Sequence, residues 1–461
     1  MKHLQIACLL ACAAIAAHAQ SSGAVVALDD GSLVVAAGSS VCHRYSTLSK
    51  VATLFVGLGY GSGGETYNSA GFGLQSITAE GRPNTRFGRN GFVVTPLLPL
   101  KNHDEAVATT LLRDGRGRLI TVGWRTQSLW PDASVILIAA ARYDASGAID
   151  PAFGDHGLVN VRLNSDGVTE ASAALLDPEG RLLIAGYNGG RKLRSKVGSF
   201  DEWTNHLFVA RFTADGRLDG SFGQHGFAVV DVVPAATKVT ANPNCKQEPK
   251  TCLWLAEQSL KSHEREFLVY GHAPTGLAID AQNRIVAGAS ASDGTYIVTR
   301  FLEDGKADTS FGSGGTTRTA MPAGSTISQI LIDHSGRLFV VGSKGDRIAL
   351  ARYTGDGHLD GEVRETAFAA GLVASGAVLT ANGRLVVAAA GEHTLAVGLF
   401  DRDGSPVKGF GRGGIVSAEV ARLTGPAGLT VNAAGESAVA ARSEDGVAIL
   451  HAGHAEPHHT Q

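Results

Sequence analysis

Paired aspartates are the most chemically suggestive residues of this 461-residue chain. There are three pairs, each enclosing a glycine: Asp215 and Asp219, Asp304 and Asp308, and Asp356 and Asp360. Such spacing invites comparison with calcium loops, but Ca²⁺ takes six to eight oxygen ligands. Two carboxylates on one tight turn supply too few. We therefore expect these side chains to accept hydrogen bonds from the backbone of their own turns.

Other motifs with known chemistry are missing or weak. The chain has no Gly-x-Ser-x-Gly elbow, Walker loop, His-Glu-x-x-His or Cys-x-x-Cys motif. The glycine-rich stretch 57–64 precedes no convincing helix, so a flexible loop is favoured over a phosphate cradle. His454, His458 and His459 favour a solvated tail over a metal site. The sequence thus predicts no cofactor and no metal site, and it leaves catalytic residues unknown.

A repeated motif of phenylalanine and glycine shows what most of the suggestive residues are for. The copies, each followed by another glycine three residues later, are Phe87-Gly88, Phe153-Gly154, Phe222-Gly223, Phe311-Gly312 and Phe410-Gly411. A sixth copy, expected just after Asp360, has decayed to Gly361-Glu362-Val363. We expect each phenylalanine to act as an aromatic plug and each glycine of the pair to take a positive φ.

Arginines recur beside aromatic residues in the same repeat. They are Arg142, Arg211, Arg300 and Arg352. A functional site occurs once or a few times, whereas a residue present in every repeat is most simply architectural. These arginines are therefore expected to pair with local carboxylates or carbonyls rather than to hold a ligand.

The repeat unit reads as a four-stranded antiparallel meander. In the clearest copy, 171–231, short apolar runs at 173–176, 181–187, 207–212 and 227–230 are separated by turn signals such as Asp177-Pro178-Glu179-Gly180. The first half of this unit recurs seven times, and the compact units after Ile279 are about 50 residues long. These features predict an all-β fold, a β-propeller with seven four-stranded blades. Six blades is the alternative if the first or last unit is only a partial sheet, and a β-helix would have shorter rungs.

The long composite motif resembles the bacterial delta-60 repeat family. It is carried by stretches such as Arg211 to Gly223 and Arg300 to Gly312, and the resemblance covers nearly all of the chain after residue 19. It implies a propeller-like exported protein of generally unknown activity, and it transfers no catalytic residues. The unit around Asp360 departs from the pattern, as does the first unit, which lacks the arginine–aromatic pair.

The ends and the cysteines predict export. Residues 1–19 have a short positive start, an apolar run and the small-x-small pattern of a signal peptide. A lipoprotein box ending at Cys12 is the minority alternative. Residues 20–453 form the predicted propeller domain, and 454–461 a disordered tail. In an oxidising compartment we expect Cys245 and Cys252 to form a disulfide, which would leave Cys42 without a cysteine partner. Pairing of Cys42 with either of them stays open.

Four unrepeated insertions mark where a site would lie. They are 42–70, 125–134, 188–205 and 237–265. By strand parity the first three are loops between second and third strands, and the last connects two blades, so all four emerge on one face. Long loops on a rigid scaffold usually carry binding, and tryptophan and arginine are favoured anchors. The predicted binding residues are Trp130, Arg191, Arg194, Trp203 and Trp254, although the loops could instead only cover the central channel.

Two functions fit these features. The first is an exported, non-enzymatic binding or scaffold module whose partner is a protein, a glycan or an envelope component. The near-neutral net charge of −3 gives no basic field for nucleic acid, and no segment after the leader could span a bilayer. The alternative is a lyase or lactonase-like hydrolase working at the channel. Its residues would come from His103, Asp104, Glu170, His263 and His272.

Overall fold

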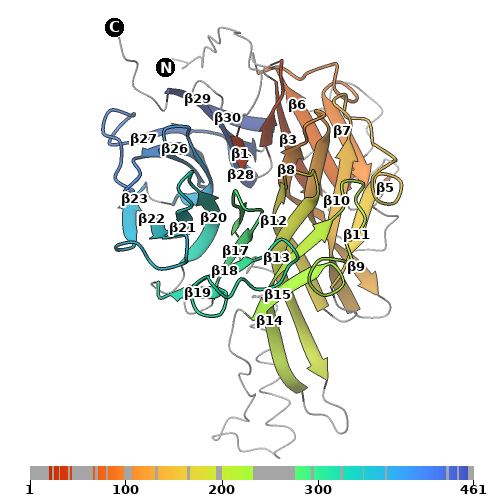
Figure 1. The fold of residues 1–461 in the computed structure, drawn as a ribbon. Helices are drawn as coiled ribbons and strands as arrows, with labels where there is room; N and C mark the ends of the chain where they lie inside the picture. The colour runs from red at the N-terminus through yellow and green to blue at the C-terminus, as the bar shows by residue number, and fades with distance from the viewer. Residues whose placement is uncertain are drawn as a thin grey trace, which may run out of the picture.

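The computed structural model forms a ring of β-sheets around a central axis (Figure 1). The structure describes these residues: 20–22, 25–30, 32–39, 42–43, 66–67, 71–78, 81–97, 106–129, 133–163, 167–193, 200–231, 276–291, 295–321, 325–345, 347–368, 371–431, 436–443 and 446–454. In these parts of the chain, no helix is long and apolar enough to cross a membrane.

The ring has seven four-stranded antiparallel blades, so the predicted β-propeller and its blade count are confirmed. Blade 1 contains β2 (Val25–Ala27), β3 (Leu33–Ser39), β6 (Gly71–Ile77) and β7 (Phe92–Pro96). Blade 2 contains β8 (Ala106–Arg113), β9 (Leu119–Leu129), β10 (Ala133–Tyr143) and β11 (Leu158–Val161). Blade 3 contains β12 (Gly167–Leu176), β13 (Leu182–Leu193), β14 (Phe200–Phe212) and β15 (Phe227–Asp231).

The second half of the ring is more compact. Blade 4 contains β16 (Gly276–Ile279), β17 (Ile285–Ser290), β18 (Tyr296–Phe301) and β19 (Thr316–Thr319). Blade 5 contains β20 (Thr326–Ile332), β21 (Leu338–Lys344), β22 (Arg347–Tyr353) and β23 (Arg364–Ala367). Blade 6 contains β24 (Val373–Leu379), β25 (Leu385–Ala390), β26 (Thr394–Phe400) and β27 (Ile415–Glu419).

Blade 7 joins the two ends of the chain. It contains β28 (Leu423–Val431), β29 (Glu436–Ser443) and β30 (Gly446–His454), and its fourth strand is β1 (Gln20–Ser22). β1 pairs antiparallel with β28, from Gln20 opposite Val431 to Ser22 opposite Leu429. β28 corresponds to the innermost strand of the other blades, and β1 pairs with it on the side of the channel. There β1 also contacts β2, β8 and β24. The N-terminal strand therefore closes the ring from inside.

Hydrophobic cores fill the spaces between neighbouring blades. A typical one joins blades 4 and 5 through Val286, Phe311, Ile330 and Tyr353, all nearly inaccessible to solvent. Around the described ring the smallest such core lies between blades 7 and 1, where it consists of Val25, Val35 and Ala440. This is the seam at which the ring closes.

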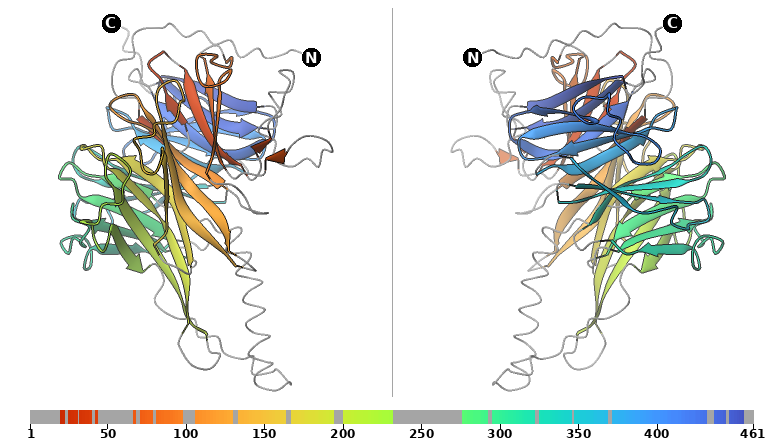
Figure 2. Two further views of the ribbon diagram at one scale, coloured as in Figure 1. Left: turned by 90° about the vertical axis from the view of Figure 1, so that its right-hand side faces the viewer. Right: turned by 90° about the vertical axis from the view of Figure 1, so that its left-hand side faces the viewer.

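Strand parity defines two faces of the disc. The turn face carries the first-to-second and third-to-fourth connections of each blade, and the loop face carries the second-to-third connections. On the loop face β9 with β10 and β13 with β14 continue as long two-stranded hairpins (Figure 2). The insertions at 125–134 and 188–205 were expected as loops, but much of each is paired strand. In the first of them the β-formers Thr126 and Ile136 face each other across the two strands, which favours continuation of the ladder.

The small pair β4 (Cys42–His43) and β5 (Thr66–Tyr67) lies within the first insertion, between β3 and β6. The fourth insertion, 237–265, lies outside the described residues, between β15 of blade 3 and β16 of blade 4.

Candidate functional site

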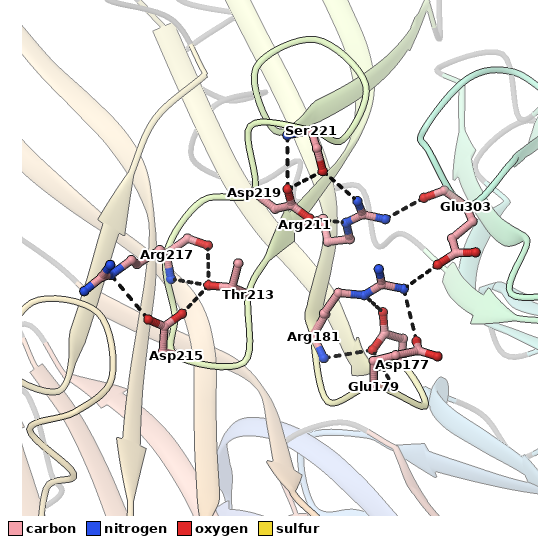
Figure 3. A network of polar contacts seen from close by, with 10 residues as sticks. All are labelled: Asp177, Glu179, Arg181, Arg211, Thr213, Asp215, Arg217, Asp219, Ser221 and Glu303. Carbon is pink, nitrogen blue, oxygen red and sulfur yellow. Dashed lines mark hydrogen bonds and ion pairs between the residues drawn. The ribbon is translucent and has the colours of Figure 1, made fainter.

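An interblade lock recurs on the turn face, made of an arginine, an aspartate and a phenylalanine. In blade 3, Arg211 Nε–H donates to Asp219 Oδ2 at 2.7 Å, and Arg211 Nη1–H donates to the carbonyl of Glu303 in blade 4 at 2.5 Å (Figure 3). The guanidinium carbon lies 4.7 Å from the centre of the Phe222 ring. The arginine is thus bonded at its edge and covered on its face, which suits a planar cation that stacks on aromatic rings.

Blades 2 and 4 repeat this arrangement. Arg142 and Arg300 donate from Nε to Asp150 and Asp308 at 2.8 Å and 2.7 Å, and lie 4.6 Å and 4.7 Å from the rings of Phe153 and Phe311. The three arginine side chains are between 3% and 6% exposed. The prediction that these arginines are structural is confirmed.

The glycine after each plug bonds to the next blade. Gly223 has φ +53° and its N–H donates to the carbonyl of Asp304 at 2.8 Å. The turn that contains Asp304 approaches so closely that a Cβ on Gly305 would lie 2.9 Å from the Phe222 ring. Glycine is required at both positions, one for its backbone conformation and one for its lack of a side chain. The Phe-Gly pair is the plug that the repeat predicted.

The paired aspartates also behave as predicted. Asp219 Oδ1 accepts from the amide and hydroxyl of Ser221 at 3.0 Å and 2.6 Å. Burial of this carboxyl acts to raise its pKa, but hydrogen bonds from Ser221 and Arg211 outweigh that and lower the pKa. Hydrogen bonds from Thr354 and His358 likewise lower the pKa of Asp356 to about 2. These aspartates serve their turns and locks. No group of three metal-ligating side chains occurs among the described residues.

The lock of blade 5 is incomplete because a whole segment is deleted. In blade 4 the lock residue Asp308 lies nine residues before Thr317, which pairs with Val298. In blade 5 Asp360 lies four residues before Arg364, which pairs with the equivalent residue, Leu350. The difference of five residues is the length of the Phe-Gly-x-x-Gly segment. The sixth copy has therefore not decayed, as the sequence suggested; it is absent.

This deletion leaves Arg352 uncovered. Its Nε–H still donates to Asp360 at 2.7 Å. Its Nη1–H donates to the carbonyl of Arg402 in blade 6 at 3.3 Å, a longer bond than the 2.5 Å of the equivalent contact of Arg211. The Arg352 side chain is 27% exposed, several times more than the other lock arginines. Val363 packs into the core between blades 4 and 5, and Phe368 packs on Phe400. Neither apolar side chain takes the place of the missing plug.

A pocket of about 310 Å³ occupies this position on the turn face, between blades 5 and 6. Its lining residues are Leu350, Arg352, Asp360, Gly361, Glu362, Arg364 and Asp403. We call it the unplugged pocket. Its volume is at the lower end of the range of small-molecule sites, about 300–1,000 Å³.

Charge in the unplugged pocket is mostly paired. Arg352 bonds to Asp360, and Arg364 Nη2 lies 3.6 Å from Asp403 Oδ2. Hydrogen bonds from Ser405, with the charge of Arg364, lower the pKa of Asp403. Glu362 is exposed and makes no ion pair with any described residue. The lining offers a guanidinium face, the apolar Leu350 side chain and one spare carboxylate, a set suited to binding.

Of the five binding residues predicted from the sequence, two lie in the described part of the chain, Arg191 and Trp203. Trp130, Arg194, Trp254, Cys245 and Cys252 lie outside the described residues. Arg191 and Trp203 lie opposite one another on β13 and β14, in the hairpin on the loop face.

Of the residues suggested for catalysis, Glu170 is buried on β12, and His103, Asp104, His263 and His272 lie outside the described residues. In the described innermost strands of the blades, Glu170 and Arg113 are the only charged residues. Arg113 ends β8 and bonds to Asp29.

The sequence does not predict the unplugged pocket. The loss of the motif after Asp360 predicts only a less regular blade. Its meaning depends on the register of β22 with β23, which shows that the segment is deleted without replacement.

Comparisons with known proteins agree with the fold. A family model described as a domain of unknown function (DUF5122) beta-propeller matches residues 197–222, which include the arginine and phenylalanine of the blade 3 lock. This match and the ring of blades place the chain among β-propeller repeat proteins. No curated protein matches the chain.

Similar solved structures include a protein from Lactobacillus plantarum, with 13% identity, a TM-score of 0.39, and coverage of 90% of this chain and 94% of that chain. A putative 6-phosphogluconolactonase from Bacteroides uniformis has 12% identity, a TM-score of 0.40 and the same two coverages, 90% and 94%. Virginiamycin B lyase from Staphylococcus aureus has 11% identity, a TM-score of 0.35, and coverage of 76% and 88%. At these identities the likeness concerns the fold alone.

Proposed function

We propose that this chain is an exported, non-enzymatic binding propeller whose ligand occupies the unplugged pocket. The observation that carries the proposal is the deletion of the five-residue plug from a blade that keeps its lock, which exposes the face of Arg352 that a ring covers in blades 2, 3 and 4. Within a repeat, a departure that creates a concave, charged site is a better candidate for function than any repeated residue.

Three further features support binding over catalysis. The lining side chains of the unplugged pocket are mostly engaged with one another, and they include no histidine, cysteine or serine. The described innermost strands carry only Glu170 and Arg113 as charged residues, which gives little acid or base chemistry facing the channel. The resemblance to the delta-60 repeat family brings no catalytic residues. We place the chain in that family and assign residues 1–19 as its cleaved leader.

The hairpins on the loop face are proposed as a second contact region, for a larger partner such as a protein, a glycan or an envelope component. Both project from the loop face of the disc (Figure 2), whereas the unplugged pocket lies on the turn face. Such a projection on a rigid ring is a common place for recognition.

Saturation-transfer NMR with the purified protein tests the proposal. The probes are three mixtures: small soluble aromatic compounds, monosaccharides, and free amino acids. We expect at least one class to receive saturation from the wild type. The competing variant carries Phe-Gly-Ser-Gly-Gly, the segment 311–315, inserted between Glu362 and Val363, and it should lose that signal. Equal signals from both proteins, or none from the wild type, would contradict the proposed site.

A further inference from the structure

The other blades of the ring show which chemical group fits the unplugged pocket. At the boundaries after blades 2, 3 and 4 a phenylalanine ring lies on the lock arginine, at 4.6 Å to 4.7 Å. Blade 1 also has its plug, Phe87, which is 1% exposed. The unplugged pocket keeps the arginine, the aspartate and the neighbouring blade, and lacks only the ring and its backbone segment.

The absence of the segment also leaves a backbone carbonyl of blade 6 without the N–H donor that a plug glycine would supply. The glycine after each plug donates to the next blade, as Gly154 does to Asp215 at 2.7 Å and Gly312 to Asp356 at 2.8 Å. The residue of blade 6 that corresponds to Asp215 and Asp356 is Asp403, one residue before the turn glycine Gly404. The carbonyl of Asp403 therefore corresponds to those of Asp215 and Asp356 and lies beside the unplugged pocket, and no backbone N–H of the described residues donates to it.

We propose that the unplugged pocket binds a peptide segment of a partner protein that carries an aromatic residue followed by glycine. The inference rests on the binding function proposed above and specifies its ligand. The aromatic ring lies on the Arg352 guanidinium, and the glycine N–H donates to the Asp403 carbonyl. The segment thus completes blade 5 in the way that the chain's own Phe-Gly segments complete blades 1, 2, 3, 4 and 6.

Charge at the rim selects among such segments. The pocket has three carboxylates, Asp360, Glu362 and Asp403, against two guanidinium groups, and Glu362 is the one without an ion pair in the described region. A basic residue next to the glycine would lie near this spare carboxylate. A segment with an acidic residue there would be disfavoured by the like charge.

The chain supplies matched probes for this proposal. An acetylated and amidated peptide with the sequence of residues 409–414, Gly-Phe-Gly-Arg-Gly-Gly, carries the basic form. The sequence of residues 152–157, Ala-Phe-Gly-Asp-His-Gly, carries the acidic form. Titration of each peptide into the wild-type protein, followed by saturation-transfer NMR, should give tighter binding for the basic peptide. Replacing its phenylalanine by alanine should weaken binding at least about tenfold.

Variants of the protein separate the parts of the site. R352M should weaken the basic peptide by about fivefold, the loss expected for one exposed cation–π contact, while its melting temperature shows that it folds. E362Q should reduce the preference for the basic over the acidic peptide. The insertion of Phe-Gly-Ser-Gly-Gly after Glu362 should abolish binding of both. The matched insertion Ala-Gly-Ser-Gly-Gly restores the loop without the ring, so it should still bind N-acetyl-phenylalaninamide.

The outcomes are distinguishable. If sugars or free amino acids bind in the pocket and none of the phenylalanine peptides does, this inference is wrong and the binding function stands. If the alanine peptide binds as tightly as the phenylalanine peptide, the ring is not the recognised group and the inference also fails. If neither the mixtures nor the peptides bind, both proposals fail together.

Discussion

The boundary between blades 4 and 5 and the boundary between blades 5 and 6 begin from the same lock. Arg300 bonds to Asp308 at 2.7 Å, and Arg352 bonds to Asp360 at the same distance. At the first boundary Phe311 covers the guanidinium, and the arginine is 3% exposed. At the second the plug is absent, and the arginine is 27% exposed. We call these the plugged and the unplugged boundary.

The difference shows that the plug seals a boundary but is not needed to form it. Blades 5 and 6 still share a full core that includes Phe339, Phe368 and Phe400. Each blade contacts two neighbours, so the ring distributes its stability over many boundaries, as repeat folds do. One boundary could lose its seal and gain a pocket without loss of the fold.

Removing the plug where it is present should have the largest effect. F311A deletes a fully buried ring and the cation–π contact on Arg300, so we expect the free energy of unfolding to fall by about 3–5 kcal/mol. Val363, a half-buried residue just before β23 that packs against the same core between blades 4 and 5, is the control. V363A should cost about 1 kcal/mol. Urea denaturation followed by tryptophan fluorescence measures both, and equal losses would show that the plug contributes no more than an ordinary core side chain.

The second largest difference in the free energy of unfolding should be between variants of the two lock arginines. R300M leaves Asp308, which is 9% exposed, with only the more distant Arg284 Nη1, at 3.6 Å, as a charged partner, and should cost about 3 kcal/mol. R352M leaves Asp360, which is 34% exposed and can be solvated, so it should cost less than about 1 kcal/mol. The same denaturation experiment compares them. If R352M lost as much stability as R300M, the lock at the unplugged boundary would be as tightly held as the lock at the plugged boundary.

Filling the unplugged pocket should change the free energy of unfolding less than the removal of a plug does, and in the opposite direction. The Phe-Gly-Ser-Gly-Gly insertion after Glu362 should raise the free energy of unfolding by about 2 kcal/mol relative to the Ala-Gly-Ser-Gly-Gly insertion, because only the former buries a ring. Comparing the two insertions removes the small cost of a longer loop. A crystal structure of the filled variant should place the ring on Arg352. A ring exposed to solvent would show that Leu350 and the turn at Gly404 have closed the space.

The fold could be predicted from the sequence because each repeat carries the same local pattern of residues. Turn residues, alternating apolar positions and the plug motif recur with regular spacing, so one well-read unit predicts the others. The arginine and aspartate roles followed from the same recurrence. The extension of the strands into 125–134 and 188–205 was not predicted, since strand ends depend on cross-strand pairing.

Two other features could not be read from the sequence, for different reasons. The unplugged pocket depends on the register of β22 with β23, and no composition or motif encodes an empty space. β1 is a three-residue strand without apolar alternation, and its partner β28 lies some 400 residues away. A short polar strand that pairs at such separation leaves no local signal.

The pH dependence of stability should give the smallest difference. Burial acts to raise the pKa of Asp308, but hydrogen bonds from Ser310 and Arg300 lower it overall. A carboxyl with a lowered pKa in the folded state stabilises the protein above its unfolded pKa, near 3.9, and this contribution is lost as the pH falls through the folded pKa. We therefore expect the free energy of unfolding to decline below about pH 4.

S310A removes the hydrogen bond from the Ser310 hydroxyl to Asp308, at 2.6 Å, and keeps the bond from the backbone amide, at 3.1 Å. This variant should be less stable at pH 7 and lose less on acidification. At the unplugged boundary Glu362 takes the place of this serine, so E362A offers the matched control, which should leave the acid slope nearly unchanged. Denaturation at pH 7, 5, 4 and 3 measures the slopes, and an unaltered slope in S310A would show that the plugged lock does not set the acid response.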